Sequence, residues 1–252
     1  MCRAISGLFM GPGELFYIAN TSDTHLLLDA DEAHHCLRVL RHRRGHRIYL
    51  TDGKGALFSA VIRADNPRHC EVELAEKLQQ EAPPKPSVHL AVAPTKNLDR
   101  FAYLLEKATE VGVTAITPLL CERSQRETVP EQRLRKIIIS AMKQSGRLWL
   151  PSLHGPTSFR AFVLQEAAKP FPCFLAHCQN NNLPDLLSSY KGEAECSLLI
   201  GPEGDFSSEE IAFAEQHGIK SVSLGSKRLR TETAGLVASL TVLIAYAWRQ
   251  SG

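Results

Sequence analysis

The chain of 252 residues is 44% hydrophobic and 22% charged, which is ordinary for a globular protein with one large domain or two modest ones. Its formal net charge is only +2, so a nucleic-acid partner has to be argued from where basic residues cluster. The 7 cysteines include no Cys-x-x-Cys pair, which disfavours a disulfide framework and a structural zinc site. We therefore expect reduced thiols, a cytoplasmic location and no bound metal.

The first third of the chain has the pattern of a small β domain. Residues 31–40 carry apolar side chains at helical spacing and predict a short helix. Residues 46–50 alternate between polar and apolar and run into a turn at Asp52-Gly53-Lys54-Gly55, and 56–62 and 70–74 predict two more strands. Several short strands joined by turns favour a small barrel.

A dense basic run follows the predicted helix. Ten residues contain Arg38, Arg41, Arg43, Arg44 and Arg47 together with His42 and His46. Such a run is a candidate for binding nucleic-acid phosphates, and a solvated turn is the alternative.

Charged and proline-rich residues at Glu81-Ala82-Pro83-Pro84-Lys85-Pro86 favour extended backbone and predict a linker. We expect domains at 1–82 and 86–252. Beyond the linker, predicted strands and helices alternate, which indicates an α/β domain with a mainly parallel sheet. The predicted strands are 88–93, 115–120, 173–176, 197–200 and 221–224; the predicted helices are 98–111, 130–145, one from a capping box at Ser207 to Gly218, and one from Thr231 onward.

The last of these helices contains the most apolar stretch, Ala234 to Trp248. That stretch is shorter than a membrane span, so we expect a buried helix with Thr231 as its N-cap.

Two strand ends of the second domain carry loops suited to a ligand. Leu198-Leu199-Ile200 runs into Gly201-Pro202-Glu203-Gly204, and the strand ending at Leu224 runs into a cationic loop before Thr231. Ligands of α/β sheets bind outside the carboxyl ends of the strands, so the two loops are expected to border one pocket. The first loop alone fits an ordinary strand-to-helix turn equally well, and the alternative for the second is a solvated loop with a capping Thr231. Neither a dinucleotide fingerprint, a P-loop nor a nucleophile elbow is present.

Taken together, several segments resemble the ribosomal RNA small subunit methyltransferase E family, the 16S rRNA N3-uridine methyltransferases. They are Ile200 to Gly204, Leu224 to Ala234, Leu105 to Val113 with Ile116 to Pro118 and Glu122 to Ser124, Gln144-Ser145-Gly146-Arg147, and His35 to Arg41 followed by Gly45. They span nearly the whole chain in the family's order, and this combination is far more specific than any one segment.

The resemblance implies an α/β fold of the SPOUT class, in which a trefoil-knotted parallel sheet follows a small PUA-like RNA-binding barrel. It also implies a homodimer that binds S-adenosylmethionine in the knot and methylates N3 of a uridine in the decoding region of 16S rRNA, either free or in the assembled small subunit. The implied cofactor-binding residues are Leu175, Leu199, Ile200, Gly201, Pro202, Glu203, Gly204, Leu224, Gly225, Leu229, Thr231 and Ala234. Apolar side chains among them are expected to enclose the adenine.

Uracil N3 becomes nucleophilic only after losing its proton, and a nearby cation stabilises the charge that develops. Arg230 is the candidate cation, with an ion pair to Glu232 as the alternative. Glu203 is the candidate general base, with a role in capping or at an interface as the alternative. The candidate RNA-binding residues are Arg38, Arg41, Arg43, Arg44 and Arg147, the last within a second basic stretch between Arg123 and Arg147.

The sequence departs from the family pattern at three places. Asp205 stands where glycine is usual, Lys227 stands where arginine is common, and Gly7-Leu8-Phe9 lacks an expected arginine. These departures put the shape of one loop and one RNA contact in doubt.

Two other functions fit the same residues. The chain could be an RNA-binding factor without catalysis, in which case it would not bind S-adenosylmethionine. It could also methylate tRNA or a 2′-hydroxyl on the same scaffold, although the PUA-like domain and the segment from Gln144 to Arg147 argue against this reading.

Overall fold

The computed structural model describes residues 14–180 and 182–251. The segment Gly7-Leu8-Phe9, where the family pattern has an arginine, lies outside the described residues. The chain divides into two compact units: residues up to Pro83 together with Ile139–Leu150, and Pro84–Ile138 together with Pro151 onward. A single cut at the proline-rich linker does not anticipate that 139–150 belongs with the first unit. The expected domain limits of 1–82 and 86–252 stay a prediction.

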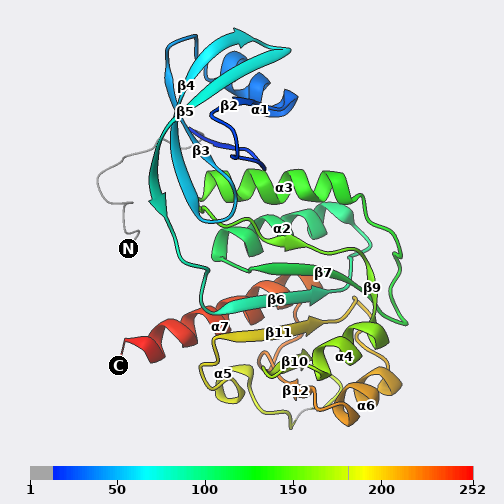
Figure 1. Cartoon of the computed structure of the whole chain (residues 1–252). Coiled ribbons are helices and arrows are strands. Elements are labelled where there is room, and N and C mark those ends of the chain that lie inside the picture. Colours follow the sequence, from blue (N-terminus) through cyan, green and yellow to red (C-terminus); the bar gives the residue numbers. More distant parts are fainter. Residues whose placement is uncertain (1–13, 181, 252) are drawn as a thin grey trace. The chain divides into compact units, whose positions relative to one another are not determined.

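The first unit is a five-stranded sheet with α1 (Ala30–His34) and a π-helical turn (His35–Val39) (Figure 1). The strand order is β1-β3-β4-β5-β2, with antiparallel pairs except between β1 and β3. Its strands are β1 (Leu15–Tyr17), β2 (His25–Leu27), β3 (Arg47–Thr51), β4 (Ala56–Asn66) and β5 (His69–Gln80). The strands predicted at 46–50, 56–62 and 70–74 are confirmed, and the last two extend further than predicted.

Segment 139–150 completes this unit. Leu148 is fully buried with Leu15 and Leu57, and its carbonyl oxygen accepts a hydrogen bond from Gly55 N at 2.9 Å. Lys143 forms an ion pair with the nearly buried Glu32. Apolar burial and these bonds therefore explain why a segment so distant in sequence belongs with the β domain.

The second unit is built on a seven-stranded sheet whose neighbouring strands all run parallel. The order is β12-β10-β11-β6-β7-β8, and the short β9 also pairs with β7. The strands are β6 (Ser87–Val92), β7 (Ala115–Leu120), β8 (Ser152–Leu153), β9 (Thr157–Ser158), β10 (Cys173–Ala176), β11 (Glu195–Ile200) and β12 (Lys220–Val222). The predicted α/β class with a parallel sheet is confirmed.

Helices cover both faces of this sheet (Figure 1). Helix α7 packs on β6 and β11 and against α2, whereas α4 and α6 pack against each other and on β7 and β12. The helices of this unit are α2 (Leu98–Val111), α4 (Phe159–Ala167), α5 (Leu186–Ser189), α6 (Ser208–Gln216) and α7 (Thr231–Gln250). Helix α3 (Glu131–Gln144) begins in this unit, and its residues from Ile139 onward belong to the first. Gly112 closes α2 in the left-handed conformation, and the capping box at Ser207 opens α6, both as predicted.

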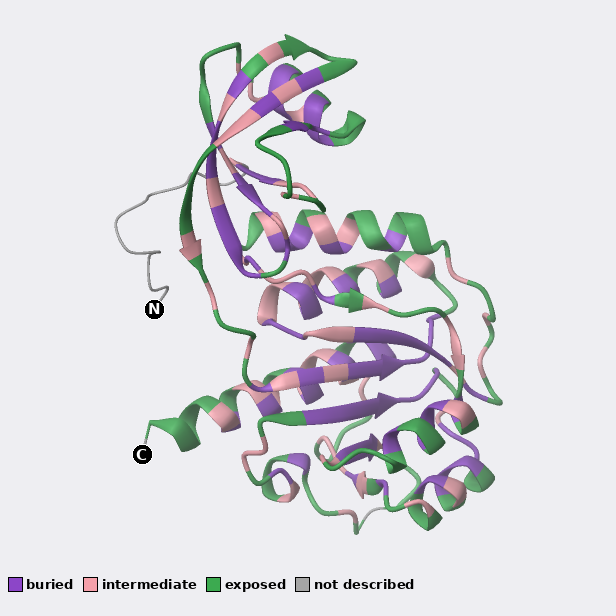
Figure 2. Ribbon diagram, viewed as in Figure 1, coloured by how far each residue is buried: buried purple, intermediate pink, exposed green. Residues whose placement is uncertain are grey.

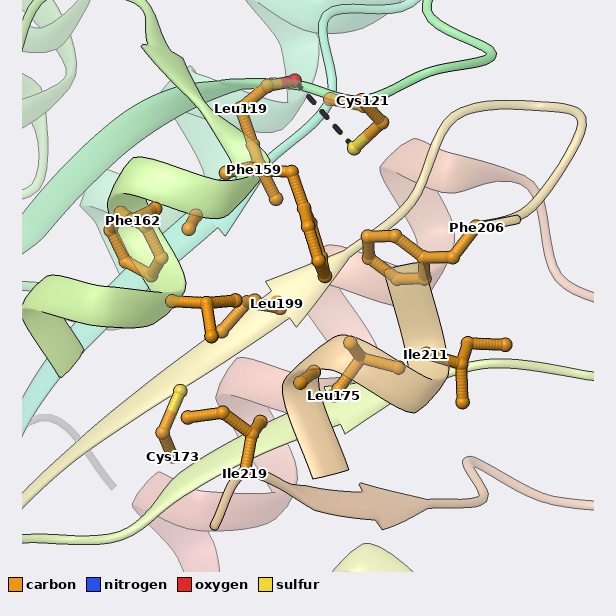
Figure 3. Close-up of a cluster of buried hydrophobic side chains, with 14 residues drawn as sticks. Leu119, Cys121, Phe159, Phe162, Cys173, Leu175, Leu199, Phe206, Ile211 and Ile219 are labelled. Carbon is orange, nitrogen blue, oxygen red and sulfur yellow. Dashed lines mark hydrogen bonds between the residues drawn. The ribbon is translucent and has the colours of Figure 1, made fainter. Parts of the chain in front are cut away.

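A dense apolar core lies between the sheet and the α4/α6 face (Figure 3). Leu175 of β10 and Leu199 of β11 meet Phe159 of α4 and Ile211 of α6 there. Figure 2 shows the same division in the ribbon, with the central strands buried and the outward helical turns exposed. Because both leucines face this core, their side chains are turned to the α4/α6 side of the sheet.

Helix α7 corrects two expectations. Its N-cap is Arg230 rather than Thr231, because the Thr231 hydroxyl instead donates to the carbonyl oxygen of Gly201 at 3.1 Å. The helix is also longer than its apolar stretch suggested: at 20 residues and a hydropathy of 1.2 it is long and apolar enough to cross a membrane, by length and composition only. Gly235, Ala238 and Val242 are buried against the sheet, but only 39% of the apolar window is buried, so the expected buried helix is buried on one face only.

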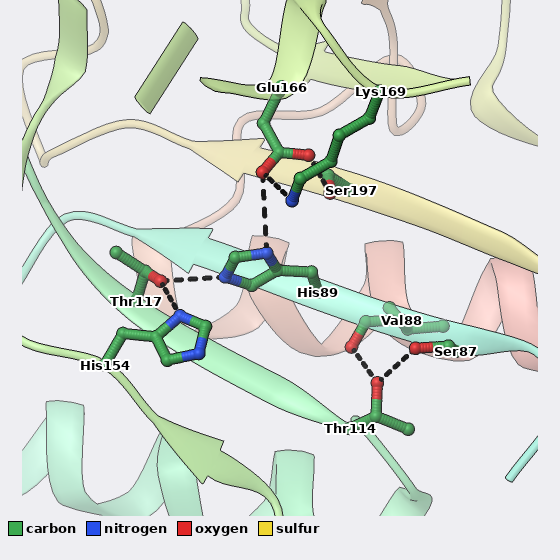
Figure 4. Close-up of polar contacts among 9 residues, drawn as sticks. All are labelled: Ser87, Val88, His89, Thr114, Thr117, His154, Glu166, Lys169 and Ser197. Atoms are coloured by element: carbon green, nitrogen blue, oxygen red, sulfur yellow. Dashed lines mark hydrogen bonds and ion pairs between the residues drawn. The ribbon is translucent and has the colours of Figure 1, made fainter. Parts of the chain in front are cut away.

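A chain of polar side chains runs through His89 of β6, from the buried Glu166 to the exposed His154 (Figure 4). His89 Nε2 lies 2.7 Å from Thr117 Oγ1, which lies 3.0 Å from Nδ1 of His154. On the other side, His89 Nδ1 is 3.7 Å from Glu166, whose carboxylate also accepts from Ser197 and Lys169 at 2.6 Å. Burial, with the nearby His154 and Lys169, lowers the pKa of His89 to about 3. His89 is therefore neutral at pH 7, and its contact with Glu166 is not an ion pair.

Because His89 is largely buried and has a low pKa, we predict a specific loss of stability in acid. The folded-state pKa of His89 lies below the unfolded value of about 6.5, so between pH 6.5 and 3 only the unfolded chain takes up this proton. The free energy of unfolding therefore falls by up to about 1.4 kcal/mol for each pH unit over this range. Thermal unfolding at pH 7 and pH 5 should show a smaller acid loss for His89→Gln than for the wild type. Equal losses in the two proteins would contradict the assignment.

Candidate functional site

A cavity of about 740 Å³ opens at the carboxyl ends of β10, β11 and β12. This volume is typical of sites for small molecules and cofactors. Three segments line the cavity: Ala176, His177, Cys178, Asn180, Leu183 and Asp185; Ile200, Gly201, Pro202, Glu203 and Asp205; and Ser223 through Thr231 with Ala234. The two loops singled out in the sequence therefore border one pocket, as predicted.

The two glycines that open these loops are needed for different reasons. A Cβ at Gly201 would lie 3.1 Å from the ring of Phe206, a tight contact that only a small shift of that ring would relieve, so the packing of this turn favours glycine. A Cβ at Gly225 would meet nothing within 4 Å, but its φ of +119° is strained for other residues. The Thr231 hydroxyl bonded to Gly201 O ties the turn after β11 to the start of α7.

Most of the predicted cofactor residues line the cavity: Ile200, Gly201, Pro202, Glu203, Leu224, Gly225, Leu229, Thr231 and Ala234. Leu175 and Leu199 instead lie in the core shown in Figure 3, and the next residues, Ala176 and Ile200, reach the cavity. Neighbouring residues of a strand point to opposite faces, which explains the difference. Gly204 is exposed beside Arg123 and does not line the cavity.

The loop after β10 was missed in the sequence. His177, Cys178 and Asn180 form a wall of the cavity because β10 lies between β11 and β12, with Ala176 in register with both Ile200 and Val222. The strand end at Ala176 was a signal for this wall. The order of strands in the sheet, which gives that signal its meaning, cannot be read from local sequence patterns.

Arg230 lines the cavity and is exposed, and no ion pair of its side chain occurs within residues 14–180 and 182–251. Glu232, the alternative partner, is buried and lies 3.9 Å from Nε of Arg100 instead. The Arg230 side chain therefore lines the cavity without the alternative ion pair to Glu232.

Glu203 also lines the cavity, and its Oε1 accepts a hydrogen bond from Lys96 N at 2.9 Å. The bond joins the turn after β11 to the loop after β6. The Glu203 side chain thus caps the loop after β6 and also lines the cavity.

Two arginines of the second basic stretch hold loops together. Arg123 donates to the carbonyl oxygens of Gly204 at 2.9 Å and Phe206 at 3.3 Å, and Arg126 donates to Lys96 O at 3.1 Å. Arg147 belongs to the first unit and is half-buried; burial lowers its pKa, which nearby Glu81 partly restores.

In the first unit, the predicted RNA-binding residues Arg38, Arg41, Arg43 and Arg44 are all exposed. Arg41 has a left-handed backbone with φ of 59°. The Arg43 guanidinium donates to Leu37 O at 3.2 Å and His42 O at 2.9 Å, so it braces the loop. Of the other three arginines, Arg38 lies within the π-helical turn and Arg41 and Arg44 follow it.

Comparison with known proteins agrees with this architecture. Family models described as an RNA methyltransferase domain and an RNA methyltransferase PUA domain match residues 82–243 and 28–75. The fold and cavity thus occur in a chain of RNA methyltransferase class.

Relatives named ribosomal RNA small subunit methyltransferase E include one from Synechocystis, 32% identical over 84% of this chain and 70% of the relative, and one from Rickettsia conorii, 30% identical over 88% and 89%. A probable rRNA-methyltransferase from Porphyromonas gingivalis superposes with a TM-score of 0.85 and 36% identity over 93% of this chain and 99% of the other. A putative methyltransferase from Legionella pneumophila, solved with bound S-adenosylmethionine, has a TM-score of 0.81 and 31% identity over 92% and 97%. The chain belongs to the ribosomal RNA small subunit methyltransferase E family.

Proposed function

We propose that this protein transfers a methyl group from S-adenosylmethionine, bound in the cavity at the ends of β10, β11 and β12, to N3 of a uridine in the decoding region of 16S rRNA. The observation that carries the proposal is the meeting of three strand ends in one cavity of cofactor size. The Legionella relative, solved with the same cofactor, supports it. We also propose that the second unit carries the trefoil knot implied by the resemblance.

The residues of the cavity suit an adenosyl group. Ile200, Leu224, Leu229 and Ala234 offer apolar surface to an adenine ring. Gly225 has open space where a side chain would stand, so a ligand can approach its backbone closely. When bound, the sulfonium of the cofactor supplies an electrophilic methyl carbon, and the protein has mainly to position the uridine against it.

The chain's own groups then act on the uracil. Loss of the N3 proton places negative charge on N3 and the two flanking oxygens, and the Arg230 guanidinium at the cavity is suited to stabilise that charge. Glu203 is the candidate acceptor of the proton, held at the cavity by its bond from Lys96 N. The target base, if it is stacked in folded RNA, has to be extruded to reach these groups.

The exposed Arg38, Arg41 and Arg44 are proposed to hold RNA phosphates. Replacing all three with alanine should weaken RNA binding and reduce the slope of log affinity against log salt by about 2 to 3, because each lost phosphate contact removes roughly 0.7 to 0.9 of slope. Fluorescence anisotropy between 50 and 200 mM salt, values chosen for sensitivity to counterion release, measures the slope. An unchanged slope would mean that RNA binds at other residues. As a control, the affinity of the triple variant for S-adenosylmethionine should equal that of the wild type.

The homodimer is proposed from one face of α7. Leu240, Ile244 and Trp248 recur at helical spacing and are 38%, 54% and 80% exposed. Exposed apolar stripes of this kind are typical of interfaces. Ile244→Glu should therefore yield a monomer in light scattering after size exclusion, whereas a wild type that is already monomeric would contradict the proposal.

Nucleoside mass spectrometry of 16S rRNA tests the reaction itself. A strain lacking the gene should lose N3-methyluridine, and expression of the wild type should restore it. Purified free rRNA and assembled small subunits, tested side by side, identify the substrate. Persistence of the modified nucleoside in the deletion strain would reject the substrate assignment. We also propose a cytoplasmic location, which an rRNA substrate implies and with which the free thiols of the described cysteines are consistent.

A further inference from the structure

Asp205 has a backbone conformation that favours glycine. Its φ is +63°, and among residues 14–180 and 182–251 only Arg41 shares a positive φ without being glycine. Aspartate visits this region more readily than most residues because its short polar side chain bonds locally, but glycine does so without steric cost. A non-glycine residue kept in this conformation is expected to make a side-chain contact that offsets the backbone strain.

The Asp205 carboxylate joins two walls of the cavity. Its Oδ2 accepts a hydrogen bond from Cys178 N at 3.0 Å, and its Oδ1 accepts one from Phe206 N at 2.9 Å. Cys178 belongs to the loop after β10, and Asp205 to the turn after β11. Both residues line the cavity, so the carboxylate links two segments that a ligand would contact. Hydrogen bonds to a charged acceptor are stronger than neutral ones.

A second tie connects the same two segments one residue further on. The Gln179 side-chain amide donates to Phe206 O, and its Oε1 accepts from Ser208 Oγ at 3.3 Å. Gln179 N in turn donates to Nδ1 of His177 at 3.2 Å. Two sets of hydrogen bonds thus hold the loop 177–179 against the turn after β11: the bond from Cys178 N to the Asp205 carboxylate, and the bonds of the Gln179 side chain.

We propose that Asp205 is a positioning residue that fixes the wall at His177 to Gln179 in the conformation that receives the adenosyl group, and so raises affinity for the cofactor. This rests on the proposed function, since it assumes that the cofactor occupies this cavity. A wall that is already ordered need not be ordered on binding, which strengthens binding without any direct contact. A glycine at 205 would keep the turn but remove one of the two ties that hold the wall, leaving only the bonds of Gln179.

Three variants separate this role from general stability. Asp205→Gly removes both hydrogen bonds while relieving the backbone, so its melting temperature should stay close to that of the wild type. Asp205→Asn keeps one acceptor oxygen and should lie between the two in affinity. Glu209→Gln removes an exposed carboxylate from the adjoining first turn of α6, outside the cavity, and serves as the matched control.

Calorimetry with S-adenosylhomocysteine and hydrogen exchange at the Cys178 amide are the measurements. We expect about tenfold weaker binding for Asp205→Gly, faster exchange at Cys178, and wild-type values for Glu209→Gln. Wild-type affinity and wild-type exchange in Asp205→Gly would overturn the inference and leave the proposed function standing. If the wild type itself binds neither S-adenosylhomocysteine nor S-adenosylmethionine, the proposed function fails instead.

Discussion

Arg230→Ala is expected to lower kcat by about a hundredfold or more while changing the Kd for S-adenosylmethionine little. The guanidinium is proposed to act on charge that develops only in the transition state, and removal of such a preorganised group typically costs 10²–10³ in rate. Its freedom from Glu232, which lies beside Arg100, makes this assignment possible. Single-turnover methylation of rRNA and calorimetry with the cofactor measure the two quantities separately.

Arg230→Lys is the partner variant for this test. Lysine keeps the positive charge without the planar fork of donors and should recover part of the rate. Equal losses of cofactor affinity and turnover in Arg230→Ala would mean that Arg230 shapes the pocket, since it is also the N-cap of α7.

Filling the cavity should abolish cofactor binding without unfolding the protein. Ala234 lies on the first turns of α7 and lines the cavity, so the ring in Ala234→Phe would occupy space proposed for the adenosyl group. We expect at least about a hundredfold weaker binding of S-adenosylmethionine, because a filled site leaves no room for the ligand. The melting temperature should change little, because the added ring enters a cavity rather than packed core.

Thr233→Phe is the matched control, one residue earlier on the same helix. Thr233 is exposed and does not line the cavity. The Thr233→Phe variant should bind the cofactor as the wild type does. A cavity-filled Ala234→Phe protein with wild-type affinity would show that the cofactor binds elsewhere.

Local patterns in the sequence predict most elements of the second unit. The apolar stripe from Leu98 to Val111 with Gly112 behind it matches α2, and the runs at 115–120 and 173–176 match β7 and β10. These signals are strong because burial on one helical face or on both faces of a strand is recorded in a few adjacent residues. The first unit is less well predicted at its ends, where β4 and β5 extend into exposed, polar residues.

What the sequence does not show depends on contacts between distant residues. The order of strands places β10 between β11 and β12 and makes the loop after it a wall of the cavity. Likewise, burial of Leu148 with Leu15 and Leu57 assigns segment 139–150 to the first unit. Thr231 resembles an N-cap locally, but its hydroxyl is taken by Gly201 O. In each case a tertiary contact decides between local alternatives.

Asp205 illustrates both what the sequence reveals and what only the structure reveals. Its departure from the glycine of the family pattern is visible in the sequence, and its consequence is not. Only the structure brings its carboxylate to the backbone of Cys178, 27 residues away. The same residue thus changes from an unexplained substitution into part of the cavity's wall.

A crystal structure of the protein with S-adenosylhomocysteine tests the central claim most directly. We predict that the adenosyl group lies between the turn at Gly201 and the loop at Gly225, with the loop after β10 against it and Arg230 beside the sulfur. Density for the ligand at any other place, with this cavity filled only by water, would contradict the account.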